Sequence, residues 1–106
     1  MTDPECEIHS LDWRDVRVEI HYRSDWSPAY REVYGQPLSL LEVRSVEPER
    51  APLPITDSGY RSHFTVAEEI ESAGGPVLFV QSALDEAAED PGWIECEAAA
   101  RQMSLF

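Results

Sequence analysis

Residues 16–22 read Val16-Arg17-Val18-Glu19-Ile20-His21-Tyr22, and this stretch decides the fold. Apolar and polar side chains alternate along it, which is the period of two expected of a β-strand with one buried face. The pattern predicts that Val16, Val18, Ile20 and Tyr22 face a hydrophobic core. It places His21 on the opposite, polar face, where a solvated histidine is favoured over a catalytic one.

Weaker strand patterns lie on either side of this strand. Residues 5–12 mix apolar and polar positions and predict a strand, and residues 13–15 have the composition of a turn. Residues 38–46 predict a further strand, in which Leu41 and Val43 point to one face and the charged neighbours point to the other. Together these segments predict a small antiparallel sheet.

Two segments without a regular pattern follow. Residues 47–54 hold three prolines in eight positions, which removes backbone donors, so we expect an ordered connection within one domain. Residues 56–64 are dense in polar groups, and Asp57-Ser58-Gly59 is typical of a turn. We expect Tyr60 and Phe64 to anchor this loop in the core. The loop is also a candidate site for an anion or a partner carboxylate, through Tyr60, Arg61 and His63.

A short helix is predicted between the two clearest strands. Ser27 is suited to cap it, Pro28 to occupy its first position, and Gly35 to end it. Three aromatic side chains cluster here, and two of them are four residues apart, so they share a face of the helix. We expect this face to pack against the domain; if it is exposed, it indicates a second protein interface. The residues are Trp26, Tyr30 and Tyr34.

The second half of the chain predicts helices. Thr65 and Glu68 have the spacing of a capping box, which predicts a helix from Val66. Gly75-Pro76 and Asp90-Pro91 each have the composition of a helix start. In the middle helix the apolar residues recur at helical spacing and form one face. They are Val77, Val80, Leu84 and Ala88.

These elements predict an α+β fold. We expect an antiparallel sheet of about three strands from the first half, covered by two or three helices from the second half. A chain of 106 residues fits one domain and is long enough to fold without disulfides or metals. We place this acidic domain at residues 1–101 and treat residues 102–106 as a separate tail.

The charge of the chain restricts its partners. The formal net charge is −13, and every basic residue is an arginine. Direct binding to nucleic acid is disfavoured, because phosphate contacts require positive charge. The acidic residues can serve solubility, or they can imitate the phosphates of a nucleic acid and bind a basic nucleic-acid-binding protein. The candidate surface for such imitation is Glu68, Glu69, Glu71, Asp85, Glu86, Glu89, Asp90, Glu95 and Glu97.

The remaining composition predicts a cytoplasmic protein without a cofactor. No stretch approaches the length of an apolar membrane span, and the first residues lack a signal pattern. Cys6 and Cys96 are expected to be reduced and buried. These cysteines and the three histidines do not form a zinc-binding spacing, so we expect no metal. We identify no catalytic constellation and expect the protein not to be an enzyme.

The last five residues carry the clearest functional signal. Gln102-Met103-Ser104-Leu105-Phe106 resembles the motif by which bacterial proteins bind the replication sliding clamp, usually Gln-Leu-Ser/Asp-Leu-Phe. Met replaces the commoner Leu at its second position, an apolar substitution of similar volume. The resemblance implies that Gln102 makes polar contacts, that Leu105 and Phe106 fill a hydrophobic pocket, and that Met103 covers the groove. It implies no fold for the other residues.

An alternative assigns the tail to the domain itself. Trp93, Cys96, Ala100 and Met103 recur at the spacing of one helical face, so Met103 is then the last core residue of the final helix. Leu105 and Phe106 would cover apolar surface of the same chain.

The expected function is that of a bacterial adaptor or modulator that docks on the sliding clamp. The alternative is an acidic inhibitor that imitates nucleic acid and occupies a host DNA-binding or defence protein. Residues 52–64 also resemble small uncharacterised proteins carried on bacterial plasmids and integrative elements. That resemblance implies a mobile-element origin, and it does not suggest any particular activity.

Overall fold

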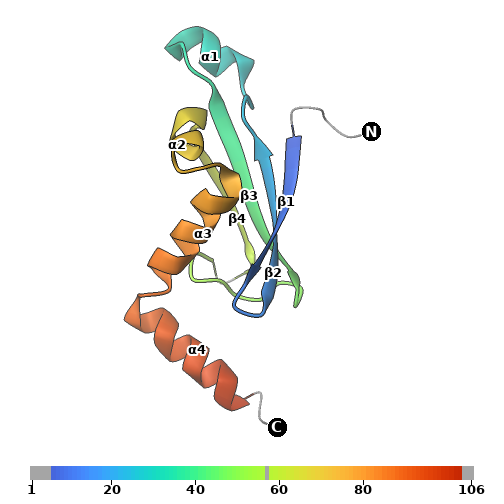
Figure 1. The fold of residues 1–106 in the computed structure, drawn as a ribbon, viewed down its shortest axis with the longest axis vertical. Helices are drawn as coiled ribbons and strands as arrows, with labels where there is room; N and C mark the ends of the chain where they lie inside the picture. The colour runs from blue at the N-terminus through green and yellow to red at the C-terminus, as the bar shows by residue number, and fades with distance from the viewer. Residues whose placement is uncertain (1–5, 57, 104–106) are drawn as a thin grey trace.

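The computed structural model of the chain describes residues 6–56 and 58–103. It has an α+β fold with a four-stranded antiparallel sheet in the order β1-β2-β3-β4 (Figure 1). The expected sheet is therefore present, with one strand more than the sequence patterns indicated. The elements are β1 (Cys6–Trp13), β2 (Val16–Arg23), α1 (Pro28–Tyr34), β3 (Leu38–Glu47), β4 (Tyr60–Val66), α2 (Ala67–Ser72), α3 (Pro76–Ala87) and α4 (Pro91–Met103).

The two faces of the sheet differ as the alternation in β2 predicted. Val18, Ile20 and Tyr22 are buried, and Leu41 and Val43 of β3 lie beside them on the same face. We call this the covered face, because α2 and α3 pack on it (Figure 1). The other face carries polar and charged residues together with a few large apolar side chains, and we call it the open face.

The predicted apolar face of α3 forms the other half of the core. Val80, Leu84 and Ala88 are buried, and Val77 packs against them, because their spacing aligns them along the side of α3 that faces the sheet. Leu53 from the proline-rich connection is also buried in this core. The connection is therefore an ordered part of the same domain, as expected.

Residues 60–66 form β4, and the prediction of a loop over 56–64 was wrong for most of this segment. Tyr60 and Phe64 do not anchor anything in the core, because 41% and 49% of their surfaces are exposed. The pairing of β4 with β3 sets Phe64 opposite Leu40, on the open face. The polar run Arg61-Ser62-His63 has no apolar alternation, so the sequence pattern did not indicate a strand here.

The start of α2 also differs from its prediction. The residue at the N-cap is Val66, which provides no side-chain cap, and Thr65 still belongs to β4. The Thr65 hydroxyl donates a hydrogen bond to the Glu69 carboxylate, so the capping box with Glu68 is not formed. The backbone N–H of Ala67 donates to the Pro37 carbonyl at 3.1 Å, which continues the strand ladder into the first residue of the helix.

Trp13 is a core residue that the sequence patterns did not predict. It was assigned to a turn, yet its side chain is buried where β1 ends, before the two-residue turn at Arg14 and Asp15. Its indole Nε1 donates a hydrogen bond of 2.9 Å to the Asp85 carboxylate on α3. Trp13 thus joins the β1–β2 hairpin to the helical layer.

A substitution at Gly59 is expected to destabilise the fold strongly. Gly59 has a φ of 77°, and a Cβ there would lie 2.7 Å from the backbone carbon of Arg50, so Gly59→Ala forces a backbone shift. We expect it to cost at least about 2 kcal/mol, measured by urea denaturation. Gly35→Ala is the matched control, because Gly35 has a similar φ of 75° but open space around it. Equal losses for the two variants would contradict this explanation.

Candidate interaction surfaces

An exposed aromatic surface lies at the end of the sheet beside α1. Trp26 and Phe64 pack edge to face with ring centroids 4.9 Å apart, and 44% of the Trp26 surface is exposed. The rings of Tyr30 and Tyr34 lie 4.4 Å apart on α1. Trp26, Tyr34 and Phe64 are exposed, and Tyr30 is half-buried.

The expectation that these aromatics form a packing face was wrong. The caps of α1 are as predicted: Ser27 accepts a hydrogen bond from the Tyr30 N–H, and Gly35 ends the helix with a positive φ. However, α1 has no buried residue, and Val33 and Tyr34 are strongly exposed. The helix projects past the end of the sheet (Figure 1), so its aromatic residues have no core to enter. We expected these aromatic residues to indicate a second protein interface if they were exposed, and those of α1 are not buried.

The structure does not gather Tyr60, Arg61 and His63 into one site. Tyr60 lies on the open face, where its hydroxyl donates a 2.6 Å hydrogen bond to the Glu42 carboxylate. This hydrogen bond raises the pKa of the Tyr60 phenol. Arg61 and His63 lie on the covered side of β4, where Arg61 donates to the Ile55 carbonyl and the His63 ring stacks on Phe79.

The acidic residues form a largely exposed surface on the helical side of the domain. Glu97 is half-buried and pairs with Arg14 at 3.2 Å, whereas the other eight members of the set are exposed. Three of these eight carboxylates also accept hydrogen bonds within the domain: Asp85 from Trp13, Glu69 from Thr65, and Asp90 from the backbone N–H of Trp93. We call the nine residues the acidic surface: Glu68, Glu69, Glu71, Asp85, Glu86, Glu89, Asp90, Glu95 and Glu97.

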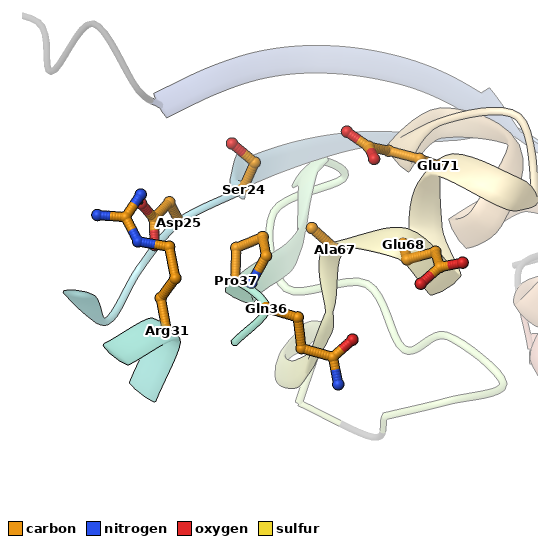
Figure 2. Close-up of a pocket in the computed structure, with 8 residues that line it drawn as sticks. All are labelled: Ser24, Asp25, Arg31, Gln36, Pro37, Ala67, Glu68 and Glu71. Atoms are coloured by element: carbon orange, nitrogen blue, oxygen red, sulfur yellow. The ribbon is translucent and has the colours of Figure 1, made fainter. Parts of the chain in front are cut away.

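A shallow hollow of about 350 Å³ adjoins the acidic surface (Figure 2). Asp25 and Arg31 lie at one side and form an ion pair of 2.8 Å. Glu68 and Glu71 of α2 lie at the other side. No sequence pattern indicates Asp25 and Arg31, because an aspartate before a helix and an arginine inside it are ordinary surface residues. The hollow contains one arginine among three carboxylates, so it favours cationic over anionic groups.

The last helix leaves the body of the domain. Trp93 packs against the core, with its ring 6.1 Å from that of Trp13, and Glu97 pairs with Arg14. Farther along, Cys96 is exposed, contrary to its expected burial, and 53% of Ile94 is exposed. Figure 1 shows α4 extending away from the sheet. The proposed apolar face of this helix therefore packs at Trp93 but not at Cys96.

Two of the expected clamp-binding residues, Gln102 and Met103, lie at the far end of α4. The backbone of Gln102 and Met103 belongs to the last turn of the helix. Ser104, Leu105 and Phe106 lie outside the described residues. The docking of this segment on the domain, or its release, stays a prediction.

Neither a metal centre nor a membrane helix is found in the part of the chain that the structure describes. No group of three or more His, Cys, Asp or Glu side chains is arranged there to hold a metal ion. None of the described helices combines the length and apolarity needed to cross a membrane.

The comparisons with known proteins give a family match. The family model described as the KlcB third domain matches residues 6–93. The matched region runs from the first residue of β1 to Trp93 in the first turn of α4, so it contains the whole sheet and the helices α1 to α3. It is compatible with a plasmid-encoded protein. No curated protein and no solved structure matches the chain.

Proposed function

The chain belongs to the KlcB third-domain family, and we propose that it is a non-enzymatic adaptor or modulator that docks on the bacterial sliding clamp. Docking takes place through Gln102, Met103, Leu105 and Phe106. The matched domain ends at Trp93, so this segment lies beyond the part that the family shares. In this proposal the C-terminal segment binds the clamp, and the domain is recruited to the clamp by that contact.

The course of α4 is the observation that carries this proposal. The helix is attached to the domain near its start, through Trp93 and Glu97, and its far end is remote from the sheet (Figure 1). A partner as large as a clamp can therefore approach the end of α4 without meeting the body of the domain. A linear motif requires this kind of access.

The energetics agree with a transient contact. Burying Leu105 and Phe106 in a hydrophobic pocket contributes about 1.5–3 kcal/mol each. Ordering the segment costs about 1–2 kcal/mol per residue in backbone entropy. Gln102 and Met103 must also leave the last helical turn, where backbone hydrogen bonding is incomplete and fraying is easy. Burial of these two side chains and ordering of the segment therefore largely offset each other, and the affinity also depends on the contacts of Gln102 and Met103. We expect a dissociation constant on the order of micromolar.

A displacement experiment tests the proposal. A labelled peptide with the sequence Gln-Leu-Ser-Leu-Phe is bound to purified bacterial sliding clamp, and fluorescence anisotropy is followed as this protein is added. The intact chain is expected to displace the peptide, and a version ending at Arg101 is expected not to displace it. Equal displacement by both versions, or none by either, would contradict the proposal.

A second candidate function rests on the acidic surface. Eight exposed carboxylates on and between α2, α3 and α4 exceed what solubility requires. Arg101 near the end of α4 is the one arginine on the described parts of these helices, and the other arginines lie on strands, loops and α1. We propose as the alternative that this surface imitates the phosphates of a nucleic acid and occupies a basic nucleic-acid-binding protein of the host.

The alternative predicts a salt-dependent competition. A bacterial DNA-binding protein with a basic groove is titrated with labelled duplex DNA in the presence of this protein. Competition is expected at low salt and is expected to fall steeply as salt rises. Replacing Glu68, Glu71, Glu86 and Glu89 with glutamine is expected to weaken it. The matched control replaces Glu19, Glu42, Glu47 and Glu49 with glutamine, which removes the same charge from residues outside the acidic surface. If both sets of substitutions weakened the competition equally, the competition would depend on net charge and not on the acidic surface.

A further inference from the structure

The edge of β4 has backbone groups directed away from the sheet. The N–H of Ser45 donates to the carbonyl of Gly59 at 2.8 Å, which fixes the pairing phase between β3 and β4. Hydrogen-bonded residues alternate along an antiparallel strand. Gly59, Arg61, His63 and Thr65 therefore direct their N–H and C=O groups toward β3, and the residues between them direct theirs outward.

Contacts at both ends of β4 agree with this phase. The Tyr60 carbonyl accepts hydrogen bonds from the hydroxyls of Thr56 and Ser58, so it points outward and is occupied. At the other end, the Ala67 N–H donates to the Pro37 carbonyl, as the same alternation requires. This leaves the N–H and C=O groups of Ser62 and Phe64 pointing outward at the edge, and no described strand lies beyond β4.

We propose that this edge pairs with the same edge of a second copy of the chain. In the antiparallel pair, Ser62 of one copy exchanges two hydrogen bonds with Phe64 of the other, and the symmetry repeats the exchange. His63 then lies opposite His63 of the second copy at the two-fold axis. This register uses the four outward groups of Ser62 and Phe64 and leaves the occupied Tyr60 carbonyl undisturbed.

The side chains in this register are complementary on both faces. On the covered side, Arg61 lies opposite Thr65 of the second copy. The Thr65 hydroxyl donates to the Glu69 carboxylate, so Arg61 of each copy lies near Glu69 of the other. The two-fold symmetry makes two such pairs of opposite charge. On the open face, Phe64 lies next to Ser62 and diagonally beside Phe64 of the second copy. The pairing thus covers a half-exposed aromatic side chain of the edge strand. A self-complementary patch of this kind is what a two-fold interface requires.

The edge also lacks the usual protection against such pairing. Natural edge strands are commonly blocked by proline, lysine or a bulge. Between Tyr60 and Val66 there is no proline and no lysine, and the pairing with β3 is regular. Association is opposed by electrostatic repulsion between the two copies, because each copy carries a net charge of −13. Dimerisation is therefore expected to strengthen as salt screens this repulsion.

Sedimentation equilibrium of the intact chain tests the proposal. A dimer is expected at about 0.5 M NaCl, with a smaller dimer fraction at low salt. Ser62→Pro removes an outward N–H without breaking the ladder to β3, and we expect it to raise the dimer dissociation constant about tenfold or more. Ser62→Val keeps the N–H and is the matched control, with dimerisation expected to be retained. A monomer at all concentrations and salts, or equal dimerisation by the proline variant, would overturn the proposal.

Cross-linking tests the register itself. In a background of Cys6→Ser and Cys96→Ser, His63→Cys places two thiols opposite each other at a non-hydrogen-bonded pair, where the Cα atoms lie about 4.5 Å apart and a disulfide can close. We expect rapid oxidation to a covalent dimer. Arg61→Cys in the same background is the control, since residue 61 pairs with residue 65 and not with itself. Equal rates for the two variants would overturn the proposed register.

Discussion

Replacing Trp13 with alanine is expected to lower the free energy of unfolding by about 3–5 kcal/mol. Only 5% of the Trp13 surface is exposed, so truncation leaves a large cavity between the sheet and α3. The hydrogen bond from its indole to Asp85 is lost as well. Trp93 also loses its aromatic neighbour, so we expect the backbone amides at the start of α4 to exchange faster with solvent.

Urea denaturation followed by circular dichroism measures this effect, and hydrogen exchange reports on α4. Trp13→Phe is the control variant, because it keeps most of the apolar volume and removes the indole N–H. Its expected cost is about 0.5–1.5 kcal/mol, since the exposed Asp85 carboxylate regains water. A loss below about 1 kcal/mol for Trp13→Ala would contradict the role of Trp13 as the residue that joins the hairpin to the helices.

The double substitution Leu105→Ala and Phe106→Ala is expected to weaken binding to the sliding clamp at least about 100-fold. Each side chain contributes about 1.5–3 kcal/mol when it enters an apolar pocket, and every 1.4 kcal/mol is a factor of ten in affinity. Because the native affinity is expected to be micromolar, the double variant should show no measurable binding at micromolar concentrations. Surface plasmon resonance with immobilised clamp measures the loss.

Ile94→Ala provides the matched control for this experiment. Ile94 is also a large exposed apolar residue of the last helix, but it lies outside the five terminal residues. Its truncation is expected to leave clamp binding unchanged. If Ile94→Ala weakened binding as much as the double substitution does, the interface would be the side of α4 and not the terminal motif.

Strict local patterns were enough to predict most of the core. The alternation in residues 16–22 correctly assigned Val18, Ile20 and Tyr22 to the buried face, because a strand with one covered face admits few other arrangements. The caps of α1 and the apolar face of α3 were also correct, since both depend on residues close in sequence.

Features that depend on tertiary pairing could not be predicted in this way. β4 forms because β3 provides a partner ladder, although its own polar run Arg61-Ser62-His63 lacks a strand pattern. Thr65 has the spacing of a cap, but the sheet extends through it, and the helix starts later. The aromatic residues of α1 have the spacing of a packing face, yet the helix projects beyond the sheet.

For the candidate sites, the sequence indicated which types of side chain to consider but not which residues lie next to one another in the fold. Eight of the nine acidic residues are exposed, because the helices of the second half place their polar faces toward solvent, and their use as one binding surface stays a prediction. Trp26 and Phe64 are far apart in sequence, and their contact at 4.9 Å follows from the way β3 pairs with β4. The terminal motif depends on a partner, so no property of the isolated domain predicts its use.

Calorimetric titration of purified bacterial sliding clamp with the intact chain tests the central proposal most directly. We expect saturable binding with a dissociation constant on the order of micromolar, which is lost when the chain ends at Arg101. The melting temperature of the shortened chain is expected to equal that of the intact chain, because the terminal residues serve the partner and not the core. Absence of binding by the intact chain, together with a lower melting temperature after truncation, would contradict the proposal and assign residues 102–106 to the domain itself.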